Sequence, residues 1–175
     1  MEKKASFGKF IWQITYAHTI AYFIAGVFAI LFLNYKELFE LDIYSGQVRS
    51  LDDPLVALGP GLQIFRGLIL ALALLPIRKS FDEKYGLFKL GLLVLGLSVV
   101  STYSGGMASF DGFIYNKLPI KYQIHCYPEA IIWILSFIGI LAISKKYEHK
   151  NITTILSIVF TALICLSSMM GFLLG

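Results

Sequence analysis

The fold is decided by residues 10–33, FIWQITYAHTIAYFIAGVFAILFL, which contain no Asp, Glu, Lys or Arg. A helix rises about 1.5 Å per residue, so roughly 20 such residues cross a hydrocarbon layer of about 30 Å. Because lipid offers the backbone no hydrogen bonds, a run of this length must become a helix. The run is too long for the core of a signal peptide and lacks the matching cleavage site, so we expect it to be retained.

Four further apolar runs follow, at about 61–77, 85–103, 128–143 and 152–174. The chain of 175 residues is 57% hydrophobic, with a mean hydropathy of +0.73. Only 15% of its residues are charged, against roughly 25% in soluble domains. We therefore predict an all-α fold, a single membrane domain over 1–175 that forms a bundle of five transmembrane helices. The short runs 61–77 and 128–143 are expected to borrow a turn from their flanking loops.

The basic residues predict how the chain is threaded. Three short segments on one side of the predicted bundle hold nine of the fifteen: Lys3, Lys4, Lys9, Arg78, Lys79, Lys84, Lys145, Lys146 and Lys150. Short loops rich in Lys and Arg stay in the cytoplasm. We therefore predict a multi-pass protein of a prokaryotic inner membrane, with its N-terminus cytoplasmic and its C-terminus outside. The same rule accounts for the net charge of +4, so no nucleic-acid partner is expected.

Small residues recur at helical spacing in three of the runs. They are Ala17, Ala21, Ala25 and Ala29 in the first, Gly67 and Ala71 in the second, and Ser157, Thr161 and Cys165 in the last. Such residues let membrane helices approach closely. They predict a compact bundle, although a homo-oligomer or a membrane-protein partner could use the same stripes.

The predicted outer loops, 34–60 and 104–127, are the long ones; the first is acidic and the second aromatic. Long loops often carry function, but an interfacial belt of aromatic residues is the simpler interpretation. Within the second loop, alternating apolar and polar residues at 120–124 predict an extended segment across the mouth of the bundle.

Arg66 is the most informative residue because it stands inside the second apolar run. A guanidinium in the membrane costs at least about 2.5 kcal/mol and cannot lose its proton. Gln63 shares its helical face. One interpretation is a cavity open to the outside that binds an anion or a lipid head group. The other is structural: Arg66 ties together loop carbonyls or the start of a broken helix near residues 59–61.

His18, at a similar predicted depth, extends this hypothesis to a polar pocket built from His18, Tyr22, Gln63 and Arg66. The simpler alternative is a neutral imidazole that hydrogen-bonds between helices. Glu129 follows Pro128 at the start of the fourth run, which suits a helix N-terminus. Glu129 could also pair with Arg66 if the second and fourth helices touch.

Motifs for catalysis, metals or cofactors are lacking. The sequence contains no P-loop, nucleophile elbow or HExxH motif, and the cluster at 125–129 does not match the spacing of zinc ligands. We expect no metal and no cofactor.

The sequence therefore favours a small integral-membrane binding or accessory subunit with an outward-facing pocket around Arg66. Its ligand would be an anionic or amphipathic small molecule or a partner segment. An oligomeric transporter or channel for small solutes or anions is an alternative, although an embedded acid for ion coupling is missing. A further alternative is an enzyme acting on a lipid or quinone, with His18 or Glu129 as acid–base group.

Overall fold

A computed structural model describes residues 7–44, 46, 48–102, 106–147 and 151–174, and every regular element in these ranges is helical. Four helical segments are long and apolar enough to cross a membrane: Phe7–Phe32, Gly59–Phe81, Ile120–Lys146 and Asn151–Leu174. The all-α class is thereby confirmed, and four of the five predicted runs form helices that could span a membrane by their length and composition. The second and fourth extend beyond 61–77 and 128–143, because the helices continue into the polar residues that border each apolar run.

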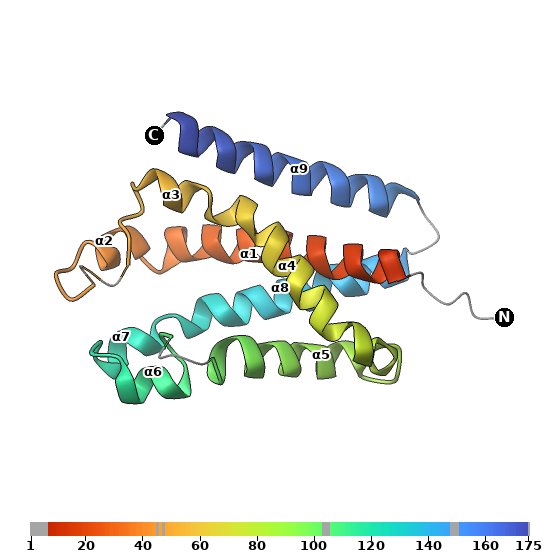
Figure 1. Ribbon diagram of the computed structural model, residues 1–175, viewed down its shortest axis with the longest axis horizontal. Coiled ribbons are helices and arrows are strands. Elements are labelled where there is room, and N and C mark those ends of the chain that lie inside the picture. Colours follow the sequence, from red (N-terminus) through yellow and green to blue (C-terminus); the bar gives the residue numbers. More distant parts are fainter. Residues whose placement is uncertain (1–6, 45, 47, 103–105, 148–150, 175) are drawn as a thin grey trace.

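These segments comprise four main α-helices. They are α1 (Phe7–Phe32), α4 (Gly59–Leu74) with its 3₁₀ extension η1 (Leu75–Phe81), α8 (Tyr127–Lys146) and α9 (Asn151–Leu174). Helix α1 lies in the middle of the bundle and packs mainly against α4 and α8. Figure 1 shows α9 at one edge of the bundle and α5 (Gly86–Leu95) at the other, where α5 packs against α8.

The predicted span at 85–103 is shorter in the structure. Helix α5 continues through the π-helical turn η2 (Gly96–Val100), which gives an apolar helix over Gly86–Val100. At about 1.5 Å per residue this helix is roughly 22 Å long, less than the hydrocarbon thickness of about 30 Å. Residue 103 lies outside the described residues. The count of five spans therefore stays a prediction.

Small residues hold α1 against its neighbours, as predicted. Ala17, Ala21, Ala25 and Ala29 are each at most 1% exposed. At the crossing of α1 and α4, a Cβ on Gly67 would lie 2.8 Å from the carbonyl oxygen of Thr15. The two backbones are therefore as close as a glycine allows.

Polar side chains attach α9 to the rest of the bundle. The Trp12 indole nitrogen donates to the Ser157 hydroxyl at 3.0 Å, and the Gly61 amide donates to the Ser168 hydroxyl at 3.0 Å. Ser157, Thr161 and Ser168 are buried, whereas Cys165 is only half-buried. The predicted stripe thus faces the bundle but continues through Ser168.

The loops 34–60 and 104–127 contain short helices and fold against each other. The first holds α2 (Tyr35–Phe39) and α3 (Pro54–Ala57); the second holds α6 (Phe110–Tyr115) and α7 (Ile120–Ile124). Tyr44, 1% exposed, stacks edge-on against Tyr122 and donates to its carbonyl at 3.4 Å. The prediction of an extended segment at 120–124 was wrong. An alternation over five residues cannot distinguish a strand from a single helical turn, which here starts after Pro119.

The described members of the three basic clusters gather at one end of the bundle. Figure 1 places the start of α1, the turn between η1 and α5, and the end of α8 at this end. Here the Lys145 ammonium donates to the Asp82 carboxylate at 2.9 Å. Which end faces the cytoplasm stays a prediction.

Candidate functional site

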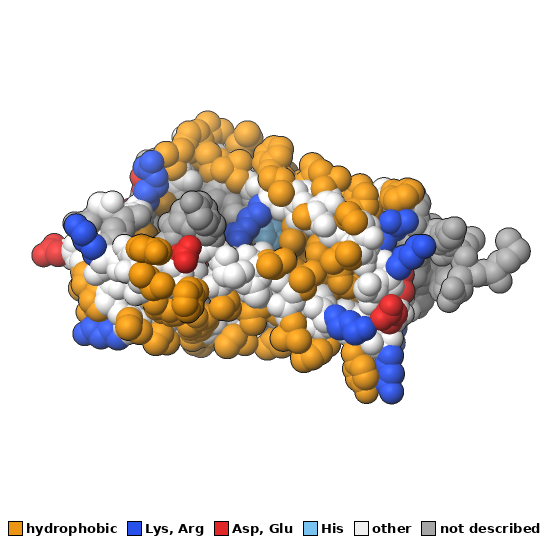
Figure 2. All heavy atoms as spheres, turned by 60° about the horizontal axis from the view of Figure 1, so that its bottom comes forward, with side chains coloured by type: hydrophobic (Ala, Val, Ile, Leu, Met, Phe, Trp, Pro, Cys, Tyr) orange, Lys and Arg blue, Asp and Glu red, His pale blue; other side chains and the backbone are white. Residues whose placement is uncertain are grey.

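Arg66 on α4 borders two adjoining cavities. The lateral cavity, of about 380 Å³, lies between α4 and the α5–η2 helix. The outer cavity, of about 150 Å³, lies toward the loops and shares Arg66 and Trp133 with the lateral one. Figure 2 shows a hollow on this face in which a basic side chain lies beside a histidine.

The lateral cavity has apolar walls and a polar floor. It forms because α4 packs on α1 and α5 packs on α8, rather than on each other. His18 of α1 and Trp133 of α8 form the floor. The walls are Ile69, Leu70, Ala73 and Leu74 from α4, Ile77 from η1, and Leu93, Val94, Leu97 and Ser98 from α5 and η2. Such a space suits the hydrocarbon part of a ligand.

The outer cavity is more polar. Tyr22, Cys126 and Glu129 line it together with Arg66. Glu129 does not form the suggested pair with Arg66, and no described residue lies in ion-pair distance of the guanidinium. The carboxylate instead accepts a hydrogen bond from the Tyr35 hydroxyl at 2.7 Å. Burial and the negative charge of Glu129 raise the pKa of Tyr35, which keeps this hydroxyl protonated.

Among the described residues, the recorded partner of the Arg66 guanidinium is an aromatic ring. The guanidinium carbon lies 5.6 Å from the centre of the Trp133 indole. No hydrogen bond joins Arg66 to a described loop carbonyl, so the suggested role in tying the loops together is not supported. The N–H groups of Arg66 can therefore donate hydrogen bonds to a ligand in either cavity.

His18, which borders the lateral cavity together with Arg66, contacts Gln63. His18 is fully buried, and its Nε2 lies 3.1 Å from the Gln63 side-chain oxygen. With that oxygen as acceptor, Nε2 carries the proton and Nδ1 is an acceptor. Nδ1 of His18 and Nε1 of Trp133 are both buried without a hydrogen-bond partner among the described residues. The floor therefore holds polar atoms whose hydrogen bonds are unmade, an unusual condition in a protein interior.

The π-helical turn η2 contributes to both cavities. Leu97 and Ser98 line the lateral cavity, and Val99 lines the outer one. The Gly96 carbonyl accepts bonds from both the amide and the hydroxyl of Ser101, each at 2.8 Å. Widened turns of this kind are frequent at functional sites.

The structure thus brings the predicted residues together. His18 bonds to Gln63, His18 and Arg66 border the lateral cavity, and Tyr22, Arg66 and Glu129 border the outer one. His18 and Glu129, the two acid–base candidates, border different cavities. Whether these residues bind a ligand stays a prediction.

Sequence reasoning missed Trp133 and Tyr35. Trp133 lies one turn after Glu129 on the same face of α8, and that spacing was the available signal. Tyr35 reaches Glu129 across 94 positions of sequence, and no local pattern indicates this contact.

Within the part of the chain that the structure describes, no three His, Cys, Asp or Glu side chains gather as metal ligands. Comparison of the chain with protein-family models, with curated proteins and with solved structures finds no match.

Proposed function

We propose that the protein is a small integral-membrane binding or accessory protein that holds an anionic amphipathic ligand around Arg66. The negatively charged head would lie at the guanidinium, between the lateral and outer cavities. The apolar part would lie in the lateral cavity. The α5–η2 helix would cross as a short fifth span, with the N-terminus cytoplasmic and the outer cavity facing outward.

The proposal rests on the observation that Arg66 borders both cavities without an ion-pair partner among the described residues. It lies seven residues past Gly59, about 10 Å from the start of its membrane segment. A cation–π contact contributes about 0.5–2 kcal/mol, whereas a guanidinium deep in a membrane costs about 2.5 kcal/mol or more. Trp133 therefore does not offset the cost alone, and an anionic head group would supply the rest.

Binding of palmitate and of its methyl ester to the purified full chain tests this proposal. The two probes share a tail and differ in charge. Palmitate is expected to bind more tightly than the ester, and Arg66→Gln should weaken palmitate binding about tenfold or more, because hydrogen bonds to charged groups contribute about 1.5–3 kcal/mol.

Arg49→Gln is the matched control. Arg49 lies in the loop before α3 and pairs with Asp53 at 2.8 Å, so its loss removes the same charge away from the cavities. Thermal unfolding of both variants checks that each is folded. Equal binding of palmitate and its ester, or wild-type palmitate affinity in Arg66→Gln, would overturn the proposal.

A further inference from the structure

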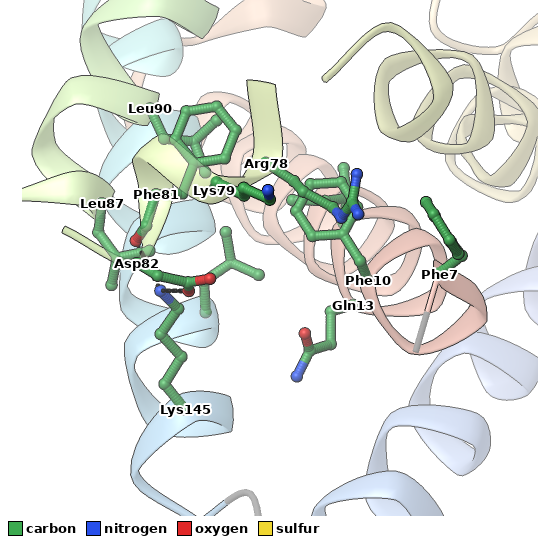
Figure 3. Close-up of a pocket in the computed structure, with 12 residues that line it drawn as sticks. Phe7, Phe10, Gln13, Arg78, Lys79, Phe81, Asp82, Leu87, Leu90 and Lys145 are labelled. Atoms are coloured by element: carbon green, nitrogen blue, oxygen red, sulfur yellow. Dashed lines mark hydrogen bonds and ion pairs between the residues drawn. The ribbon is translucent and has the colours of Figure 1, made fainter. Parts of the chain in front are cut away.

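A third cavity lies at the opposite end of the same helices. It has a volume of about 320 Å³ and is formed where α1 begins, η1 ends and α8 ends. We call it the basic cavity, because Arg78, Lys79 and Lys145 line it, and Asp82 is the one acidic residue among its described lining residues. Figure 3 shows Lys145 and Asp82 joined on one side, and Arg78 on the other side with Gln13 below it in this view.

Two of the three cations are held in place. The Lys145 ammonium donates to the Phe81 carbonyl at 2.7 Å and to Asp82 at 2.9 Å. The Arg78 guanidinium donates to the Leu75 carbonyl at 3.1 Å and lies 4.3 Å from the centre of the Phe7 ring. Cations positioned in this way lose little conformational freedom when a ligand binds.

The polar groups of the cavity retain unused donors. Arginine has five N–H groups, and Arg78 uses one toward a described residue. The Lys79 ammonium and the side-chain amide of Gln13 make no hydrogen bond or ion pair to a described residue. Since Asp82 is already paired with Lys145, the positive charge of Arg78 and Lys79 is left uncompensated within the described structure.

The remaining walls are apolar. Phe10, Leu87, Leu90 and Leu141 line the cavity below the charged groups. Leu90 is 1% exposed and Leu141 is 5% exposed, so this floor belongs to the packed interior. A ligand with a charged group and an adjoining hydrocarbon part would match both sets of walls.

We propose that the basic cavity binds a phosphate group, that of an anionic phospholipid. A guanidinium recognises phosphate through paired N–H donors, and a lysine adds a point charge. The cavity lies at the ends of the membrane helices, where lipid phosphates lie, and basic pockets between such helices bind anionic head groups. This proposal does not involve Arg66 and stands independently of the proposed function.

Native mass spectrometry of the full chain with added phosphatidylglycerol, phosphatidylcholine or inorganic phosphate tests it. Phosphatidylglycerol is expected to bind, and Arg78→Gln with Lys79→Gln should weaken its binding about 30-fold, because the charge-assisted hydrogen bonds to the phosphate are lost. Phosphatidylcholine, whose choline neutralises its phosphate, should bind far more weakly.

Lys84→Gln with Lys146→Gln is the matched control, since it removes the same charge at the same end. These two lysines do not line the cavity and lie over the rings of Tyr85 and Tyr147. We expect the control to change phosphatidylglycerol binding by less than about threefold, as screened surface charges contribute little. An equal loss in both double variants would show only general attraction of basic residues to lipid and would overturn the proposal.

The measurements with inorganic phosphate and with phosphatidylcholine show which kind of phosphate compound the cavity binds. Binding of inorganic phosphate that depends on Arg78 and Lys79, with no binding of phosphatidylglycerol, would keep the phosphate site and assign it to a soluble ligand. Binding of phosphatidylcholine as tight as that of phosphatidylglycerol would refute recognition of an anionic group. Thermal unfolding confirms that each variant is folded before its binding is compared.

Discussion

The crossing of α1 and α4 at Gly67 gives the sharpest test of the packing. In Gly67→Ala, the new Cβ would lie 2.8 Å from the Thr15 carbonyl oxygen and 3.0 Å from its Cα. Both are backbone atoms, so no side-chain rotation relieves the overlap and one helix must move. Overpacking of this kind costs about 1–3 kcal/mol.

A glycine-to-alanine substitution at a position with room for the methyl group gives the reference value for the unfolding free energy. Gly139 on α8 has no atom within 4 Å of an added Cβ. Gly139→Ala should therefore gain only the helix preference of alanine, about 0.5–1 kcal/mol. We expect Gly67→Ala to be less stable than Gly139→Ala by about 1–3 kcal/mol, because both variants share that gain.

Equilibrium unfolding of the two purified variants in mixed micelles with a rising fraction of SDS measures this difference. Palmitate binding offers a second measurement, since Gly67 adjoins Arg66 and its added Cβ would lie 3.3 Å from the His18 ring. Equal unfolding free energies for Gly67→Ala and Gly139→Ala would refute the close backbone approach. If Gly67→Ala is destabilised but binds palmitate as tightly as the wild type, the helix crossing does not determine the geometry of the binding site.

Three further outcomes are expected from single substitutions. Tyr35→Phe should lower the unfolding free energy by about 1–2 kcal/mol, because it leaves the half-buried Glu129 carboxylate without its 2.7 Å donor; the loss should vanish in a Glu129→Leu background, which has no acceptor at this position. Trp12→Phe removes the 3.0 Å bond to Ser157 and should cost about 0.6 kcal/mol, the average for such bonds in membranes, in the same SDS assay. Burial raises the pKa of Tyr44 to about 12, above its usual value of about 10, so its contribution to stability is complete below pH 10 and lost as pH rises toward 12. Unfolding measured across this range should show that loss in the wild type and not in Tyr44→Phe.

Apolar length predicted the helices well and their ends poorly. Hydropathy marks the hydrocarbon layer, but a helix can continue into polar residues, as η1 does through Arg78 and Lys79 to Phe81. The opposite error occurred at 85–103. There the hydroxyl and amide of Ser101 both bond to the Gly96 carbonyl, and the helix ends at Val100. Average hydropathy over a stretch of sequence does not detect a side chain that competes with the backbone for hydrogen bonds.

The candidate site was predictable in its charge and depth but not in its partners. Arg66 and His18 stand out because each is unusual inside an apolar run, and equal depth placed them together. The rotation of α8 about its axis decides that Trp133 faces Arg66, and packing against α1 sets that rotation. In the same way, the folding of the loops 34–60 and 104–127 brings Tyr35, rather than Arg66, to Glu129.

The two proposed sites are separated along one helical segment, which makes them independent. Arg66 and Arg78 are twelve residues apart, about 18 Å along the axis. Leu74, Leu90 and Val94, each at most 5% exposed, belong to the packed core between the two cavities. Effects at sites more than about 10 Å apart with no shared partner usually add. Substituting Arg66 should therefore leave phosphatidylglycerol binding intact, and substituting Arg78 should leave palmitate binding intact. A change of more than about threefold in the unaltered site would mean that one elongated ligand, or one moving helix, joins the two cavities.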